Sequence, residues 1–226
     1  YERAILTLLL VLGALFFLRT TGNPLNRNQR IFALSGGLIL FNLLLLRLVI
    51  EFGDSALAEA APLLPTIIPY LLPIILGPMI ITILVGTRPG ILAAGLIATF
   101  NAMMQGNSLA VLLVSQLACL VAISACRNIQ LRSSLVRAGS LSGAVVAVGA
   151  LLLGLRNEVA VVTVLYQITA SIGIGLLSGI LIVGVLPVLE NLFKYTTDIT
   201  LLELTDFNHP LLRKMQLEAP GSYHHS

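Results

Sequence analysis

The sequence predicts an all-α, polytopic membrane protein: a bundle of seven transmembrane helices followed by a short helical cytoplasmic tail. Three observations lead to this fold class. Of the 226 residues, 57% are hydrophobic and only 10% are charged, whereas a soluble domain carries about 25% charged residues. The charges gather in short clusters between long apolar runs. The arginine-rich clusters alternate with arginine-poor ones, which is typical of a chain that crosses a bilayer repeatedly.

Seven apolar segments are the expected spans. They are Ala4–Leu18, Ile31–Ile50, Thr66–Val85, Ile91–Met104, Leu109–Cys126, Ala138–Leu155 and Val161–Leu189. A spanning helix needs about 20 residues, and most segments reach that length with a few flanking residues. The first is short because we expect the chain, which opens on Tyr1 without a Met, to begin inside a span. We also expect its other end to interrupt the start of a further helix.

The loop arginines predict the orientation of the bundle. They are Arg19, Arg27 and Arg30 in the first loop, Arg88 in the third, Arg127, Arg132 and Arg137 in the fifth, and Arg156 in the sixth. Cytoplasmic loops carry an excess of Lys and Arg, so the odd loops and the C-terminus are expected inside and the N-terminus outside. The fourth segment is short enough for a re-entrant loop. We keep it as a span, because otherwise the three arginines of the fifth loop would face outward.

The third segment contains three internal prolines, Pro69, Pro73 and Pro78. Each removes a helix hydrogen bond and clashes with the preceding turn, although neighbouring helices make this tolerable in a membrane. We expect a kinked helix after an irregular outer loop. The alternative is a broken helix that lines a substrate site, as in transporters. The absence of charged residues beside the prolines favours the kinked helix.

Small residues recur four apart in the last two segments: Gly139 and Gly143 in one, and Ser171, Gly175 and Gly179 in the other. Such stripes let helix backbones approach closely in lipid. We expect them to pack within the bundle. A homo-oligomer that packs through the same stripes is the alternative.

Polar residues are sparse in the spans, and no Asp, Glu or His lies deep in any of them. This argues against a proton relay and against an intramembrane metalloprotease, which needs His and acidic ligands. We expect Asn101 and Gln116 to hydrogen-bond across helices. Cys119 and Cys126 lie about 10 Å apart on one helix, too far for a disulfide, so we expect them to be packing residues. The expected surroundings are lipid, with no nucleic-acid partner.

The composition changes after Leu189, which divides residues 1–189, the transmembrane domain, from residues 190–226, a juxtamembrane linker. Glu190 begins the linker. Asp198 or Thr200 can cap a short helix, with Glu203 at capping-box spacing from Thr200. Asn208 can cap a second helix that has His209 and Pro210 in its first turn. His209 is expected to start or pack this helix rather than to bind a ligand.

This tail carries a family resemblance. The stretches LPVLENLF (186–193), TTDITLLEL (196–204), NHPLL (208–212) and EAPGSYHHS (218–226) follow in order. Together they resemble the junction between membrane and catalytic domain in the bacterial seven-transmembrane receptor HD hydrolases. The rest of the chain is similar to that family in helix count, orientation and general character.

The resemblance implies a larger protein in the bacterial cytoplasmic membrane, with an extracytoplasmic domain before the spans and a metal-dependent HD phosphohydrolase after them. Characterised members of the family hydrolyse cyclic di-AMP. By this resemblance His225 matches the first metal ligand of an HD domain, with His224 a structural neighbour, and residues 190–226 comprise the linker and the first residues of a truncated HD domain. Its metal is expected to be Mn or Fe. One ligand cannot hold a catalytic metal, so we expect no catalytic residue and no cofactor within these 226 residues.

Two function classes follow. The first is a transmembrane sensor that couples an external domain to the HD domain, with a passive membrane anchor as its simpler form. The second is a small-molecule transporter, which the prolines of the third segment favour and which predicts a polar cavity and inverted repeats. No convincing repeat is visible in the sequence. An enzyme complete within these residues lacks the necessary ionisable groups.

Overall fold

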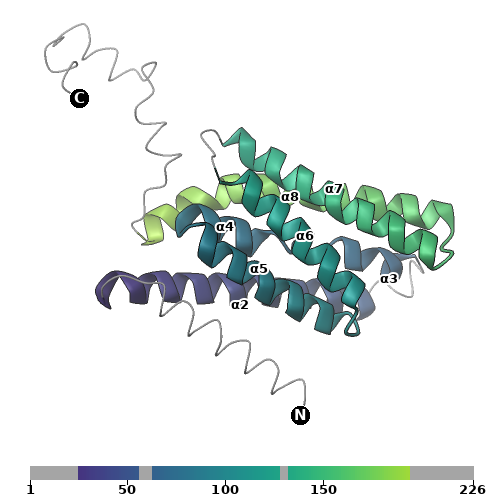
Figure 1. Ribbon diagram of the computed structural model, residues 1–226, viewed down its shortest axis with the longest axis horizontal. Coiled ribbons are helices and arrows are strands. Elements are labelled where there is room, and N and C mark those ends of the chain that lie inside the picture. The colour runs from purple at the N-terminus through teal and green to yellow at the C-terminus, as the bar shows by residue number, and fades with distance from the viewer. Residues whose placement is uncertain (1–24, 56–62, 128–131, 194–226) are drawn as a thin grey trace, which may run out of the picture.

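The computed structural model describes residues 25–55, 63–127 and 132–193, which form a bundle of helices (Figure 1). The α-helices are α2 (Leu25–Ser55), α3 (Leu64–Ile67), α4 (Leu76–Leu84), α5 (Thr87–Met104), α6 (Leu109–Ala125), α7 (Ser133–Arg156) and α8 (Val161–Phe193), with a 3-10 turn η1 (Ile68–Tyr70) after α3. The predicted all-helical class is confirmed. The expected first span, Ala4–Leu18, lies outside the described residues.

Three of the described helices are long and apolar enough to cross a membrane: α2 over Leu34–Glu51, α7 over Ser133–Arg156 and α8 over Val161–Asn191. The predicted segments in α5 and α6 are also helical, with 18 and 17 residues, but they are not among these three candidate spans. The full count of seven spans therefore stays a prediction. Helix α8 has 33 residues and is about 50 Å long at 1.5 Å per residue, so it exceeds the roughly 30 Å thickness of a bilayer core.

The third apolar segment is broken, and the expectation of one kinked helix is wrong. The chain forms α3 and η1 up to Tyr70, continues without regular helix, and becomes helical again at Leu76. Pro69 lies in η1 and Pro73 in the irregular stretch, so both remove donors where a continuous helix would need them. Pro78 lies in the first turn of α4, where its missing N–H costs nothing.

Helix α4 occupies the centre of the bundle. It contacts α2, α5, α6 and α8, while α7 packs against α6 and α8 (Figure 1). Eight of its nine residues are buried. The turn into α5 is tight: Gly86 has φ +132°, a conformation that side chains rarely adopt. This turn sends α5 back antiparallel to α4.

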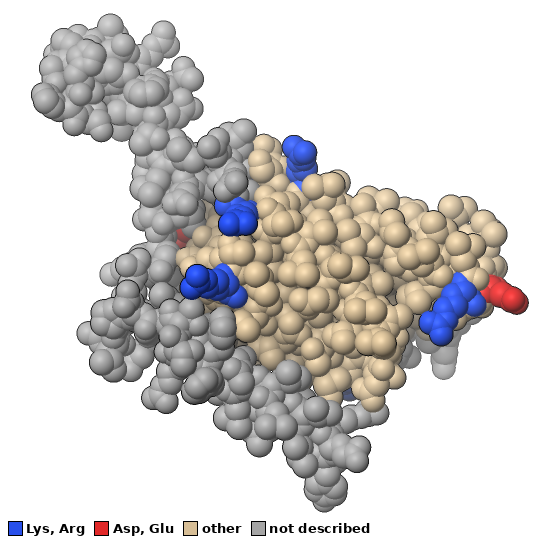
Figure 2. Space-filling view, in the orientation of Figure 1, with Lys and Arg blue, Asp and Glu red and all other residues tan. Residues whose placement is uncertain are grey.

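The outward faces of the helices are apolar. Leu40 and Leu44 on α2 and Leu155 on α7 expose 69%, 57% and 70% of their surface, which suits contact with lipid and not with water. Figure 2 shows the described charged side chains toward the two ends of the bundle, with an uncharged band between them. The described residues thus have the surface of a membrane-embedded bundle.

The chain direction sorts the arginines between the two ends. Because successive helices run antiparallel (Figure 1), the starts of α5 and α7 and the ends of α6 and α8 meet at one end, which we call the arginine-rich end. Arg88, Arg127, Arg132 and Arg137 belong to it. Arg47 and Arg156 belong to the opposite, arginine-poor end, where Arg47 forms a 2.8 Å ion pair with Glu51.

Candidate functional site

The broken third segment, which runs from α3 through η1 to α4, is held by side chains from three other helices. Asn42 Nδ2 of α2 donates to the carbonyl oxygen of Pro73 at 3.0 Å. Cys119 Sγ of α6 lies 3.7 Å from the carbonyl oxygen of Ile74. Gln167 Nε2 of α8 donates to the carbonyl oxygen of Thr66 at 3.0 Å. A break at membrane depth leaves backbone groups without helical partners. The Ile74 carbonyl is such a group, because Pro78 four residues later has no N–H, whereas the Pro73 carbonyl also accepts from the backbone N–H of Leu76 at 3.4 Å.

Two of these side chains keep an unused acceptor. Asn42 is 1% exposed and Gln167 is 5% exposed, and the amide oxygen of each, Oδ1 and Oε1, has no hydrogen-bond partner among the described residues. Asn42 packs closely against Gly77 of α4: a Cβ added at Gly77 would lie 3.3 Å from Asn42 Cβ. The glycine therefore permits α2 and α4 to approach at the break.

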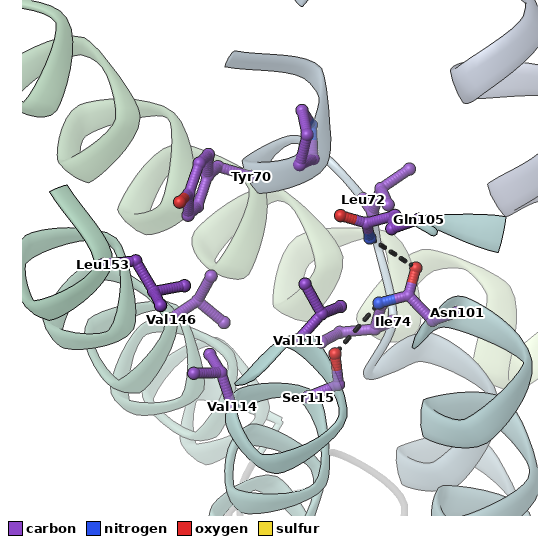
Figure 3. A pocket seen from close by; sticks show the side chains of 11 residues that line it. Tyr70, Leu72, Ile74, Asn101, Gln105, Val111, Val114, Ser115, Val146 and Leu153 are labelled. Atoms are coloured by element: carbon purple, nitrogen blue, oxygen red, sulfur yellow. Dashed lines mark hydrogen bonds between the residues drawn. The ribbon is translucent and has the colours of Figure 1, made fainter. Parts of the chain in front are cut away.

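A cavity of about 60 Å³ lies beside the broken segment, between η1 and helices α5, α6 and α7 (Figure 3). Its polar wall is formed by Asn101, Gln105 and Ser115, and its opposite wall by apolar side chains of α6 and α7 such as Val114 and Val146. The cavity lies toward the arginine-poor end, because Gln105 follows the last residue of α5.

The polar wall is a chain of hydrogen bonds. Gln105 Nε2 donates to Asn101 Oδ1 at 2.8 Å, and Asn101 Nδ2 donates to Ser115 Oγ at 2.9 Å. The predicted bond of Asn101 across helices is therefore confirmed, since Ser115 belongs to α6. The chain fixes the Asn101 amide orientation and joins α5 to α6.

The predicted small-residue stripes lie face to face between α7 and α8, the two helices in most extensive contact. A Cβ added at Gly143 would lie 2.6 Å from the carbonyl oxygen of Ser171, and one at Gly175 would lie 2.6 Å from that of Gly139. A Cβ at Gly179 would lie 2.7 Å from Val136 Cα. Any side chain at these glycines would overlap the facing backbone.

Other predicted site residues fall at or beyond the end of the described chain. Helix α8 continues to Phe193, so Glu190 belongs to this helix, where it is buried. Asp198, Glu203, Asn208, His209, Pro210 and His225 lie outside the described residues. Within residues 25–55, 63–127 and 132–193, no group of three His, Cys, Asp or Glu side chains is placed to hold a metal ion. These residues therefore offer no set of ligands for the metal of an HD hydrolase.

Sequence reasoning found some of these contacts and missed others. Asn42 and Gln167 stand out as polar residues inside apolar segments, but their partners are backbone carbonyls of the third segment, which no sequence pattern identifies. Ser115 carries no distinguishing pattern. Cys119 and Cys126 are free and buried, as expected, but the contact from Cys119 to Ile74 was not predicted.

Comparison with known proteins gives one family and two relatives. Residues 2–197 match the family described as 7TM receptor with intracellular HD hydrolase. The chain is 29% identical over 232 residues to the cyclic-di-AMP phosphodiesterase PgpH of Listeria monocytogenes, a match that covers 96% of the chain and 30% of the relative. It is 50% identical over 52 residues to PgpH of Bacillus subtilis, which covers 23% of the chain and 7% of the relative.

The chain therefore spans under a third of the length of the Listeria relative. No solved structure matches it. The family match covers all of the described helices.

Proposed function

Since the chain belongs to the family of 7TM receptors with an intracellular HD hydrolase, we propose that it is the transmembrane sensor region of a metal-dependent cyclic di-AMP phosphodiesterase. The substrate is taken from the names of the two relatives, both cyclic-di-AMP phosphodiesterases. The hydrolase itself belongs to the part of such a protein that this chain does not span. What the chain contributes is membrane insertion and a route from one side of the membrane to the other.

The observation that carries this proposal is the exit of α8 at the arginine-rich end. Four of the six arginines with described side chains lie at that end, and α2 also begins there with Arg27 and Arg30. The positive-inside rule assigns this end to the cytoplasm. Helix α8 then enters the cytoplasm with its C-terminal turns, in the direction that the family requires for an intracellular hydrolase.

The contacts of α8 support a coupled sensor over a passive anchor. In its first half, Gln167 forms a hydrogen bond to Thr66 of the broken segment. Its middle packs closely against α7 through the glycine stripes. A displacement of the broken segment at the arginine-poor, external end would therefore reach α8 directly. Such a displacement changes the hydrolase only if a ligand binds one arrangement of the bundle better than another.

A transporter is the second candidate, and the broken third segment is the observation that favours it. Transporters use freed backbone groups at such breaks to bind substrates. Here the carbonyl oxygens of Thr66, Pro73 and Ile74 accept from side chains of the bundle instead. The adjacent cavity, at about 60 Å³, has room for only about two water molecules. These observations favour a structural role for the break.

The test is hydrolysis of cyclic di-AMP with Mn²⁺, comparing this chain with the complete product of its gene in the same detergent. Activity of the complete product and none of this chain would support the proposal. A complete product that is correctly inserted, binds Mn²⁺ and still leaves cyclic di-AMP intact would contradict the assigned substrate. Uptake of a solute by vesicles that contain this chain alone would move the transporter to first place.

A further inference from the structure

The cavity beside the broken segment has a buried floor and a half-buried rim. Asn101 and Ser115 are 2% and 3% exposed, whereas Tyr70, Gln105 and Val111 are of intermediate exposure. The rim residues come from η1, from the residue after α5 and from the first turn of α6, which all lie toward the arginine-poor end. The cavity is thus a pocket that runs inward from that end of the bundle.

The lining of the pocket defines the chemistry of an occupant. No charged side chain lines it, and a bare ion in a largely apolar site without a counter-charge is strongly disfavoured. The polar wall offers the Ser115 hydroxyl and the Asn101 and Gln105 amides, while Val114 and Val146 face them (Figure 3). An occupant that satisfies both walls has one hydrogen-bonding end and one apolar end.

We propose that this pocket is a binding site for a small neutral molecule that carries an amide or hydroxyl group and a short apolar body. Its volume of about 60 Å³ corresponds to about two water molecules, or to a molecule of roughly three or four non-hydrogen atoms. Two rim residues, Pro69 and Tyr70, belong to η1, which follows directly on α3, and α3 contains Thr66, the partner of Gln167. An occupant therefore touches the turn that directly follows the helix bonded to α8. This binding site goes beyond the proposed function and does not depend on the identity of the hydrolase.

The experiment uses acetamide as the probe, because it has four non-hydrogen atoms, one amide and one methyl group, and dissolves poorly in lipid. Saturation-transfer NMR measures its binding to the purified chain in detergent micelles. A ligand of this size is expected to bind with a dissociation constant on the order of millimolar. Acetate, which has the same size but is charged, is expected to bind at least tenfold more weakly.

Matched variants on one turn of α6 separate the pocket from the lipid-facing surface. Val111 lines the pocket, whereas Leu113 lies outside it and is 55% exposed. Val111→Phe fills the pocket and should weaken acetamide binding at least tenfold, while Leu113→Phe should leave it unchanged. Ser115→Ala retains the pocket but removes one polar group, and should weaken binding severalfold.

Two results would overturn the proposal. One is the absence of saturable binding by the wild-type chain up to 100 mM acetamide, on the order of a hundred times the expected constant. The other is equal binding by wild type, Val111→Phe and Leu113→Phe, which would place acetamide in the micelle. If Val111→Phe does not fold, acetamide binding by Ser115→Ala is compared with binding by Ser124→Ala to decide whether acetamide occupies the pocket. Ser124 is the control because it is exposed and bonded only within its own helix turn. None of these measurements uses hydrolysis, so their failure is distinct from failure of the proposed function.

Discussion

Gln167 and Thr66 lie 101 residues apart in the chain and are joined by a 3.0 Å hydrogen bond from the Gln167 side chain to the Thr66 carbonyl oxygen. This bond connects the last helix of the bundle to the segment that prolines have broken. Gln167 is buried, whereas Thr66 is exposed, so the bond is partly buried. Whatever moves α3 therefore acts on α8, and α8 leaves the bundle at the arginine-rich end.

We predict that Gln167→Leu destabilises the bundle by about 1 kcal/mol. Interhelical hydrogen bonds in membrane proteins contribute about 0.6 kcal/mol on average and up to about 1.7. The measurement is reversible unfolding of the detergent-solubilised chain by a denaturing detergent.

Thr169→Val is the matched control for Gln167→Leu. Thr169 is exposed on the same helix, and its hydroxyl bonds only to the carbonyl of Leu165 one turn earlier. Its replacement should change the free energy of unfolding by less than about 0.5 kcal/mol, as surface substitutions usually do. If both variants lose the same stability, the bond to Thr66 has no special role in holding the broken segment.

We predict opposite effects for alanine at two neighbouring glycines of α8. A Cβ at Gly175 would lie 2.6 Å from the carbonyl oxygen of Gly139, whereas a Cβ at Gly173 meets nothing within 4 Å. Gly175→Ala should destabilise the α7–α8 pair by about 1–3 kcal/mol, as overpacking does. Gly173→Ala should be neutral or stabilising by up to about 1 kcal/mol, because Ala favours helix.

The same unfolding assay measures both glycine variants. Equal stability of Gly175→Ala and Gly173→Ala would show that α7 and α8 do not approach as closely as the structure has them. The oligomeric state should be determined in parallel. A Gly175→Ala chain that stays fully stable but loses a dimer would instead assign the stripe to contact between copies.

Periodicity revealed the glycine stripes but not the break in the third segment. Residues four apart fall on one helix face, so Gly139 and Gly143 could be placed together from spacing alone. Pro73 is compatible with either a kinked or a broken helix, and the choice depends on what its carbonyl can bond to. That partner, Asn42, belongs to another helix, and the pairing has no local signature. The pocket was beyond prediction for the same reason, since its walls come from four separate elements.

We predict measurable coupling between Asn101 and Ser115, whose side chains share a 2.9 Å hydrogen bond. A double-mutant cycle of Asn101→Ala and Ser115→Ala should give a coupling energy of about 0.5–1.5 kcal/mol in the free energy of unfolding. The comparison cycle pairs Asn101→Ala with Ser124→Ala, which shares no contact with Asn101 and should be additive within about 0.5 kcal/mol. Coupling of the same size in both cycles would mean that the substitutions perturb α6 as a whole.

The orientation of the bundle predicts which of two cysteines, introduced at the two ends of α7, can be labelled from outside the cell. Ser133 and Asn157 are both exposed and lie at opposite ends of this helix, which at 24 residues is about 36 Å long and can cross a bilayer core of about 30 Å. Because Ser133 follows the arginine-rich α6–α7 loop, the positive-inside rule places it in the cytoplasm. Asn157→Cys should therefore react with a membrane-impermeant maleimide in intact cells, and Ser133→Cys only after permeabilisation.

The wild-type chain supplies the background, since its Cys119 and Cys126 are buried. The reverse labelling pattern would place the end of α8 outside the cell, where it could not lead to an intracellular hydrolase, and labelling of both positions from outside would show that α7 does not cross the membrane.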